Sequence, residues 1–154
     1  MPCRDRLPFL PRSGRSSTAL PRASAVPVRR FLSHSKEGWA SGEAYNYAIT
    51  SDGVVVGRCG LHRRIGPGGL DIGYWLHHAW TGRGLAAMAA AALVQAGRGL
   101  PGIDRIEIHH DEAHPASGAV ARRLGFTEIE CMRLPEGPDA PGETGVQVRW
   151  RLQI

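Results

Sequence analysis

The chain has few cysteines, few aromatic residues and no long apolar run. Its three cysteines (Cys3, Cys59 and Cys131) lie far apart and form no CxxC pair, which argues against a zinc ribbon or a disulfide scaffold and fits a reducing cytoplasm. No stretch approaches the roughly 18 apolar residues of a membrane-spanning helix, so we expect no membrane partner. The remaining composition, 42% hydrophobic and 21% charged over 154 residues, argues against a disordered chain and suffices for one domain with its own core.

The positive charge is concentrated near the start of the chain. Residues 1–30 hold seven Arg and one Asp, a local charge of +6. Residues 31–154 hold twelve Lys and Arg against thirteen Asp and Glu, a local charge of −1, and the two parts together give the formal net charge of +5. A nucleic-acid-binding protein that uses the Arg-rich start is therefore the weaker alternative, because that segment has few aromatic residues to stack on bases. We expect no nucleic-acid partner.

Residues 1–27 are interpreted as an irregular basic tail and residues 28–154 as a single domain. The tail holds five of the eleven prolines and shows neither helical nor strand periodicity. A targeting peptide is one interpretation, but the prolines would break the amphipathic helix that such peptides form. A solvated extension is the interpretation we favour.

The domain alternates between strand and helix patterns, which is typical of α/β or α+β architecture. Apolar residues with a period of two predict strands, and helical spacing predicts helices between them, over the strands 45–49, 54–61, 70–76, 105–109, 126–131 and 146–152 and the helices 28–39, 83–96 and 115–124. Gly97 and Gly99 are expected to end the 83–96 helix. Its buried face is predicted to consist of Leu85, Met88, Ala89, Ala92, Leu93 and Ala96.

A glycine-rich loop between the 70–76 strand and the 83–96 helix carries the clearest sign of chemistry. It reads Thr81-Gly82-Arg83-Gly84-Leu85-Ala86. Its backbone N–H groups lie at the positive end of a helix dipole, and glycines let an anion such as a diphosphate approach closely. Arg83 can add a charge-assisted contact. An ordinary strand-to-helix turn is the alternative, and the absence of GxGxxG argues against a dinucleotide-binding Rossmann fold.

A second motif favours the binding interpretation. It consists of His114 and Ser117, followed by Leu124-Gly125-Phe126. The two motifs together resemble the GNAT N-acetyltransferase superfamily, most closely its RimJ/RimL-type branch, over roughly residues 30–135. The family loop reads Gln/Arg-x-x-Gly-x-Gly/Ala, which Gly84 and Ala86 match and Thr81 does not. The later family motif is Asn-x-x-Ser, in which His114 here replaces Asn.

The resemblance implies a mixed, mostly antiparallel sheet with a V-shaped split between its central strands, flanked by helices. It also implies transfer of an acetyl group from acetyl-CoA to a primary amine of a protein N-terminus or a small molecule. Ser117 would hydrogen-bond or protonate the departing thiolate. Acetyl-CoA would be held by the backbone near Leu76, by His114 and by the loop residues Thr81, Gly82, Arg83, Gly84, Leu85 and Ala86.

The acceptor amine must lose a proton before it attacks, so the reaction needs a general base. In a strand, every second residue lies on the same face, so Asp71 shares a face with Gly73 and Trp75, and Glu107 shares a face with His109. Either carboxylate is a candidate base, and either can instead be an ion-paired residue of the sheet. We expect no metal site, because the clustered histidines span loops rather than one helix face. Tyr74 and Trp75 are interpreted as sheet core rather than acceptor-site walls.

A degenerate or truncated GNAT-like domain with weak or no catalysis is the second hypothesis. Thr81 and His114 support it, as does the absence of the strand and helix with which GNAT domains open. Only residues 28–39 resemble the helix before the first hairpin. A sheet without its first strand exposes an edge, which favours a homodimer or poor solubility.

Overall fold

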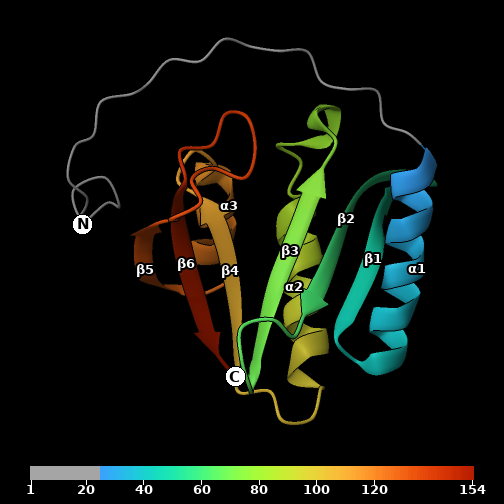
Figure 1. Ribbon diagram of the computed structural model, residues 1–154, viewed down its shortest axis with the longest axis horizontal. Coiled ribbons are helices and arrows are strands. Elements are labelled where there is room, and N and C mark those ends of the chain that lie inside the picture. Colours follow the sequence, from blue (N-terminus) through green and yellow to red (C-terminus); the bar gives the residue numbers. More distant parts are fainter. Residues whose placement is uncertain (1–24) are drawn as a thin grey trace.

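The computed structural model describes residues 25–154, so the interpretation of residues 1–24 lies outside it. The first helix is longer than expected and includes residues 25–27, which were wrongly assigned to the tail. Pro27 sits in the first helical turn, where its missing N–H has no partner to lose. The elements are α1 (Ala25–Ser41), β1 (Ala44–Ser51), β2 (Val54–His62), β3 (Gly69–Leu76), the 3-10 turn η2 (His78–Trp80), α2 (Leu85–Arg98), β4 (Arg105–Asp111), α3 (Pro115–Arg123), β5 (Thr127–Arg133) and β6 (Val146–Gln153) (Figure 1).

The strands of the described residues form one sheet of mixed direction in the order β1-β2-β3-β4-β6-β5 (Figure 1). The β1–β2, β2–β3, β4–β6 and β5–β6 pairs are antiparallel, and β3 and β4 are parallel. A parallel pair requires a crossover connection, which α2 supplies. The predicted mixed, mostly antiparallel sheet is confirmed.

The two central strands separate after a short pairing. β3 and β4 pair only over Gly69–Ile72 and Arg105–Ile108. β3 remains paired with β2 up to Leu76, and β4 remains paired with β6 up to Asp111. Each central strand follows the twist of its own half-sheet, so the two strands diverge. This divergence is the V-shaped split that the family resemblance predicted.

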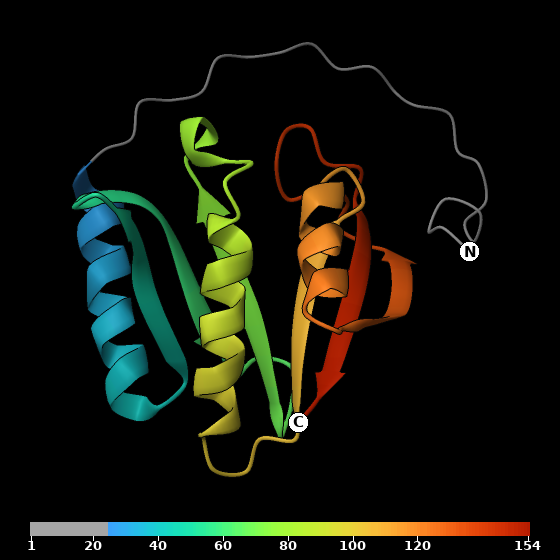
Figure 2. The ribbon, with the colours of Figure 1, turned by 180° about the vertical axis from the view of Figure 1, so that it is seen from behind.

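The core lies between the sheet and the two helices that cover its rear face, α2 and α3 (Figure 2). Its most buried large side chains come from the adjacent strands β2, β3 and β4; they include Leu61, Leu70, Ile72, Ile106 and Ile108. Each such side chain contributes about 1.5–3 kcal/mol through burial.

The predicted buried face of α2 is partly wrong. Leu93 is buried as expected, but Met88 is 68% exposed, and the other buried positions are Ala90, Val94 and Gly97. The segment is apolar around most of its circumference, so its sequence pattern marks no single stripe. The helix begins at Leu85 rather than Arg83, since Gly84 has a left-handed backbone with φ of 77°.

Gly97 lies inside α2, and the prediction that it ends the helix is wrong. The helix continues to Arg98, and Gly99 is its C-cap residue. A Cβ on Gly97 would lie 2.8 Å from Cδ1 of Ile106 and 3.3 Å from Cδ1 of Leu70. The glycine therefore permits close packing of the helix on β3 and β4.

β1 pairs with β2 and is an edge strand of the sheet over residues 25–154. The expected homodimer stays a prediction. None of the helices in the same residues is long and apolar enough to cross a membrane.

Gly97→Val should lower the free energy of unfolding by about 1–3 kcal/mol, because the added methyl groups overpack the contact with Ile106. Gly99→Val is the matched control, since a Cβ there meets only Ala96 O at 3.5 Å. We expect the control to change stability by under about 1 kcal/mol. Urea denaturation of both variants measures the difference, and equal losses would contradict the packing role of Gly97.

Candidate active site

The two parallel strands bring two helix N-termini to the same edge of the sheet. α2 starts at Leu85 after the end of β3, and α3 starts at Pro115 after the end of β4 (Figure 2). Because β3 and β4 have separated at this edge, the helix starts flank the mouth of the V. A helix N-terminus attracts anions through its free N–H groups and its dipole.

The glycine-rich loop at the start of α2 is open toward solvent. Gly82 and Gly84 have positive φ of 74° and 77°, and a Cβ on either would meet nothing within 4 Å. No acceptor within residues 25–154 bonds the backbone N–H groups of residues 84–87. Free donors, an open approach and the first turn residues Leu85 and Ala86 fit the diphosphate of coenzyme A.

The side chains of Thr81 and Arg83 contact the 3-10 turn η2, which precedes the loop. The Thr81 hydroxyl donates a hydrogen bond to His78 O at 2.8 Å. The Arg83 guanidinium lies over the Trp80 ring, 4.6 Å from its centroid, and donates to Ala79 O at 3.2 Å. The charge of Arg83 is thus held beside the loop.

The backbone of Leu76 faces the opening of the V. His77 donates its N–H to Val56 O of β2 at 2.8 Å. The N–H groups of successive residues in an antiparallel strand point to opposite sides. The Leu76 N–H therefore points away from β2, toward the side from which β4 has departed.

His114 and Ser117 lie at the start of α3, on the other side of the V. His114 occupies the N-cap position without a side-chain cap bond, and its Nε2 lies 3.5 Å from Oε1 of Glu143. The Ser117 N–H donates to His114 O at 3.0 Å. The Ser117 hydroxyl lies beside the phenol of Tyr74 in β3. Burial raises the pKa of Tyr74, and Ser117 acts in the opposite direction.

The two predicted carboxylates lie side by side on adjacent strands. Asp71 and Glu107 are register partners in the β3–β4 pair and are 1% and 4% exposed. Arg64, from the loop before β3, donates its Nε to Oδ2 of Asp71 at 2.6 Å and pairs with the same oxygen through Nη2. Asp71 is therefore held in an ion pair with a cation whose own side chain is largely exposed.

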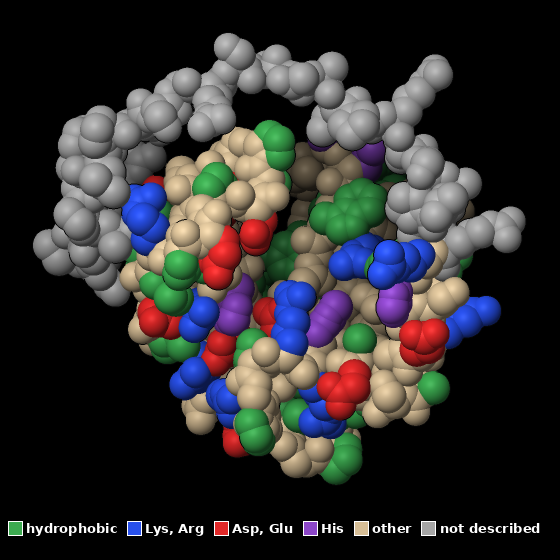
Figure 3. Space-filling view, in the orientation of Figure 1, with side chains coloured by type: hydrophobic (Ala, Val, Ile, Leu, Met, Phe, Trp, Pro, Cys, Tyr) green, Lys and Arg blue, Asp and Glu red, His purple; other side chains and the backbone are tan. Residues whose placement is uncertain are grey.

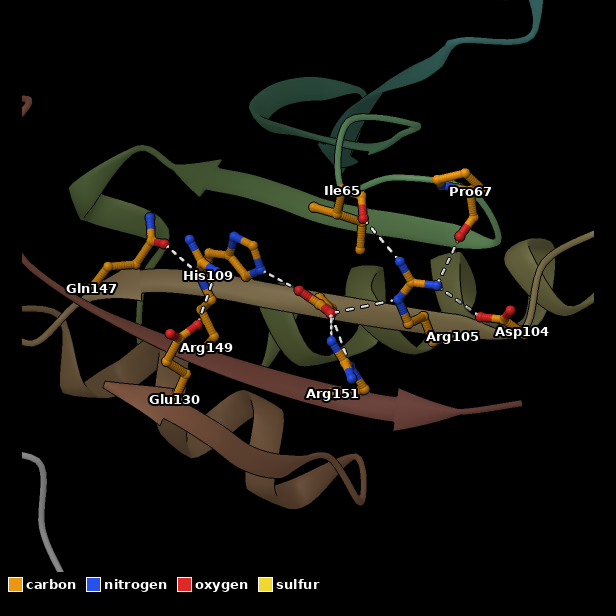
Figure 4. Close-up of polar contacts among 10 residues, drawn as sticks. Ile65, Pro67, Asp104, Arg105, His109, Glu130, Gln147, Arg149 and Arg151 are labelled. Carbon is orange, nitrogen blue, oxygen red and sulfur yellow. Dashed lines mark hydrogen bonds and ion pairs between the residues drawn. The ribbon is translucent and has the colours of Figure 1, made fainter. Parts of the chain in front are cut away.

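Glu107 is held by a denser set of partners (Figure 4). Its Oε1 accepts hydrogen bonds from Nε and Nη2 of Arg151 at 2.9 and 2.6 Å, and its Oε2 lies 2.6 Å from Nε2 of His109. Burial alone would raise the pKa of Glu107, but the hydrogen bonds from His109 and Arg151 and their charge hold it below 4.5. Glu107 is thus ionised at neutral pH and well suited to orient the His109 imidazole.

His109 was not among the site residues predicted from the sequence. The available signal was its parity with Glu107, two residues away on the same face of β4. Sequence alone does not show that a carboxylate and an imidazole two residues apart in a strand will bond to each other. The structure brings them together because Arg151 of β6 holds the carboxylate from the other side.

A pocket of about 720 Å³ lies on this face, which α2 and α3 leave uncovered. Basic, acidic and histidine side chains gather on the same face (Figure 3). The pocket walls come from the loop before β3, from β4, from β6 and from the loop before β6; they include Arg64, Glu107, His109, Glu143, Arg149 and Arg151. Gly73 lies on the β3 side, and a Cβ on it would meet nothing within 4 Å.

Trp75 lies on this open face and is 55% exposed, so its interpretation as sheet core is wrong. It shares parity with Asp71, which places it on the face that α2 and α3 do not cover. Tyr74 points to the other face and packs against the core, as expected.

Asp111 fixes the loop that forms one pocket wall. Its carboxylate accepts hydrogen bonds from the backbone of Ala113 at 2.8 Å, Thr144 at 3.1 Å and Gly145 at 2.8 Å. Burial would raise its pKa, but these hydrogen bonds hold it below 3.8. The sequence contained no motif that pointed to this anchor.

His110 is a structural residue rather than a ligand. Its Nδ1 lies 2.7 Å from Asp111 O and its Nε2 accepts from Trp150 Nε1 at 3.0 Å, so the neutral tautomer with hydrogen on Nδ1 satisfies both contacts. Burial lowers the pKa of His110 from 6.5; His114 acts in the same direction, and the backbone of Asp111 and the charges of Asp111 and Glu128 oppose it.

The lowered pKa of His110 predicts a loss of stability in mild acid. Above about pH 6.5 the imidazole is neutral in both states, and its stabilising contacts are fully present. As the pH falls from there through the folded-state pKa, the unfolded chain binds the proton more readily, so the free energy of unfolding decreases. Each unit of difference in pKa contributes about 1.4 kcal/mol.

His110→Gln keeps an acceptor for Trp150 and should flatten the dependence of unfolding free energy on pH between about pH 7 and pH 5. Urea denaturation across that range measures the slope. An unchanged slope would instead assign the effect to another group, such as His62, whose pKa burial also lowers.

The family model for an acetyltransferase (GNAT) domain matches residues 14–127, which is well over half of the chain. A comparison with curated protein sequences finds no match.

Solved structures share the fold. RimL, a ribosomal L7/L12 α-N-protein acetyltransferase in complex with coenzyme A, is 27% identical with a TM-score of 0.74, covering 86% of this chain and 74% of its own. An acetyl transferase from Salmonella typhimurium that modifies the N-terminal serine of 50S ribosomal subunit protein L7/L12 is 25% identical with a TM-score of 0.73, covering 86% and 76%. RimJ of Mycobacterium smegmatis, at 21% identity, a TM-score of 0.72 and coverage of 83% and 61%, is similar in fold. The chain belongs to the GNAT family of acetyl-CoA-dependent N-acetyltransferases.

Proposed function

We propose that the chain acetylates the α-amine of a protein N-terminus, with the amine bound in the pocket beside the V. The observation that carries this proposal is the junction between the V and the pocket. His109 is the first β4 residue beyond the β3–β4 pairing, it lines the pocket, and the open space at Gly73 lies across the split from it. The two relatives at 25–27% identity, which act on ribosomal protein L7/L12, support a protein N-terminus as acceptor.

Acetyl-CoA supplies the activated acetyl group as a thioester. The free N–H groups at the start of α2 bind its diphosphate, and Gly84 lets that group approach the backbone. The Leu76 N–H donates to the acetyl oxygen as negative charge develops there. His114 lies at the opposite rim of the V, at the N-cap of α3.

His109 acts as the general base. Its Nε2 hydrogen is held by Glu107, which leaves the lone pair of Nδ1 to accept the proton of the amine. Glu107 thereby positions the base instead of removing the proton itself, and Asp71 anchors Arg64 at the pocket wall. Ser117 donates a hydrogen bond to the departing thiolate.

Gly84→Glu should abolish most of the stabilisation by acetyl-CoA, because a carboxylate at this position opposes a diphosphate. Acetyl-CoA at about a hundred times its Kd should stabilise the unchanged chain by about 2.7 kcal/mol. Gly102→Glu is the matched control: Gly102 also has positive φ, at 71°, and nothing within 4 Å of its Cβ position, but it lies in the loop between α2 and β4.

Both variants carry the same left-handed strain of about 1–2 kcal/mol, so only their response to ligand should differ. Thermal melts with and without acetyl-CoA measure that response. A normal melt of the unchanged chain without any shift would support the degenerate domain instead.

His109→Gln should lower kcat by about 10²–10⁴-fold, the range for loss of a general base. Glu107→Gln should lower it less, by about tenfold, because the imidazole loses its charged partner. His34→Gln, on the exposed side of α1, is the control and should leave kcat unchanged. Activity is measured as acetyl transfer to a peptide whose only amine is its α-amine, against a peptide whose only amine is a lysine side chain.

Two outcomes would contradict this proposal. Faster transfer to the lysine peptide would exclude selectivity for the α-amine. A large loss in Asp71→Asn together with an active His109→Gln would assign the general base to Asp71.

A further inference from the structure

A pair of hydroxyl groups meets inside the split between the two half-sheets. Tyr74 has the parity of Ile72, so its ring faces the helices and packs against the core. Its hydroxyl oxygen is buried and makes no well-formed hydrogen bond to any of residues 25–154. Its polar neighbour is the Ser117 hydroxyl in the first turn of α3.

The two residues come from opposite sides of the V. Tyr74 lies two positions beyond Ile72, the last β3 residue that pairs with β4. Ser117 is the third residue of α3, the helix that follows β4. The two residues therefore come from opposite half-sheets, and the Ser117 hydroxyl lies close enough to Tyr74 to act on its phenol.

The Tyr74 hydroxyl is a hydrogen-bond donor at neutral pH. Burial raises its pKa, so the phenol keeps its proton. A buried hydroxyl without a partner is unfavourable, and catalytic hydrogen bonds that are poorly aligned without ligand often tighten when the ligand binds. The Ser117 hydroxyl is its polar neighbour without ligand. A bond from the Tyr74 hydroxyl to the Ser117 oxygen, formed when coenzyme A binds, would leave the hydrogen of Ser117 for a third atom.

We propose that Tyr74 is a positioning residue, whose hydroxyl donates to the Ser117 oxygen and thereby turns the Ser117 O–H toward the sulfur of coenzyme A. This inference rests on the proposed function. When the carbon–sulfur bond breaks, its electron pair goes to sulfur, and the Ser117 O–H hydrogen-bonds the resulting thiolate. Tyr74 keeps its proton, His109 holds the proton from the amine, and the thiolate takes up a proton from water after release.

A double-mutant cycle in the full chain tests the coupling. Tyr74→Phe removes only the hydroxyl and should lower kcat about tenfold, the rate equivalent of one hydrogen bond, with the KM for acetyl-CoA and the Tm unchanged. In a Ser117→Ala background the same change should have no further effect on kcat. Tyr47→Phe, in the edge strand β1, is the matched control and should leave kcat unchanged.

An unchanged kcat in Tyr74→Phe would overturn the inference. Equal losses from Tyr74→Phe with and without Ser117 would overturn it too, because the two hydroxyls would then act independently.

A second measurement needs no acceptor and separates this inference from the proposed function. Coenzyme A labelled with ¹³C at the carbon beside sulfur reports the pKa of the bound thiol by NMR. The unchanged chain should hold this pKa lower than Tyr74→Phe does, because its hydroxyl pair stabilises the thiolate. A difference without transfer to the peptide would reject the proposed acceptor and keep the hydroxyl pair, whereas equal values or no binding of coenzyme A would overturn the pair.

Discussion

The short parallel pairing between β3 and β4 is the constraint on which the rest of the site depends. The two strands share only the register from Gly69 to Ile72, and each keeps its antiparallel partner much further. Backbone hydrogen bonds on the outer sides therefore hold the two half-sheets intact while their twists carry the inner edges apart. The exposed Leu76 N–H, the two helix starts beside the split and the meeting of Tyr74 with Ser117 all result from that separation.

Strand parity lets β4 contribute to the core and to the site at once. Ile106 and Ile108 are buried against the helices, while Glu107 and His109 line the opposite face. An ionised carboxylate as buried as Glu107 loses most of its hydration, and Arg151 and His109 must offset that loss. The ion pair thus matters to stability as well as to the orientation of the imidazole, and removing either partner disturbs both.

At the rim of the pocket, too, a carboxylate is held by hydrogen bonds, here that of Asp111. The loop before β6 has no strand or helix of its own. The Asp111 carboxylate accepts hydrogen bonds from the N–H groups of Thr144 and Gly145 in this loop and from that of Ala113 between β4 and α3. The carboxylate of Glu143 also accepts hydrogen bonds from the N–H groups of Asp139 and Ala140, so local hydrogen bonds rather than core packing hold this wall. This allows the pocket wall to vary in sequence without changing the sheet beneath it.

Local patterns in the sequence account for most of the elements and for the glycine-rich loop before α2. The period-two runs predicted the strands, and Gly84 lies at the helix start that the family motif implies. The errors arose where packing overrides local preference. Gly97 was expected to end α2 but permits close contact with Ile106, and Trp75 was assigned to the core but lies on the uncovered face.

The sequence by itself determined the alternation of strands and helices, the family and the glycine-rich loop, because these depend on the order and spacing of neighbouring residues. Only the tertiary structure decided which side chains meet in the candidate site. The partnership of Glu107 with His109 needs Arg151 from β6, and that of Tyr74 with Ser117 joins β3 to α3. Such contacts join residues far apart in the chain, and the geometry of the split sheet, which no local pattern encodes, brings them within reach.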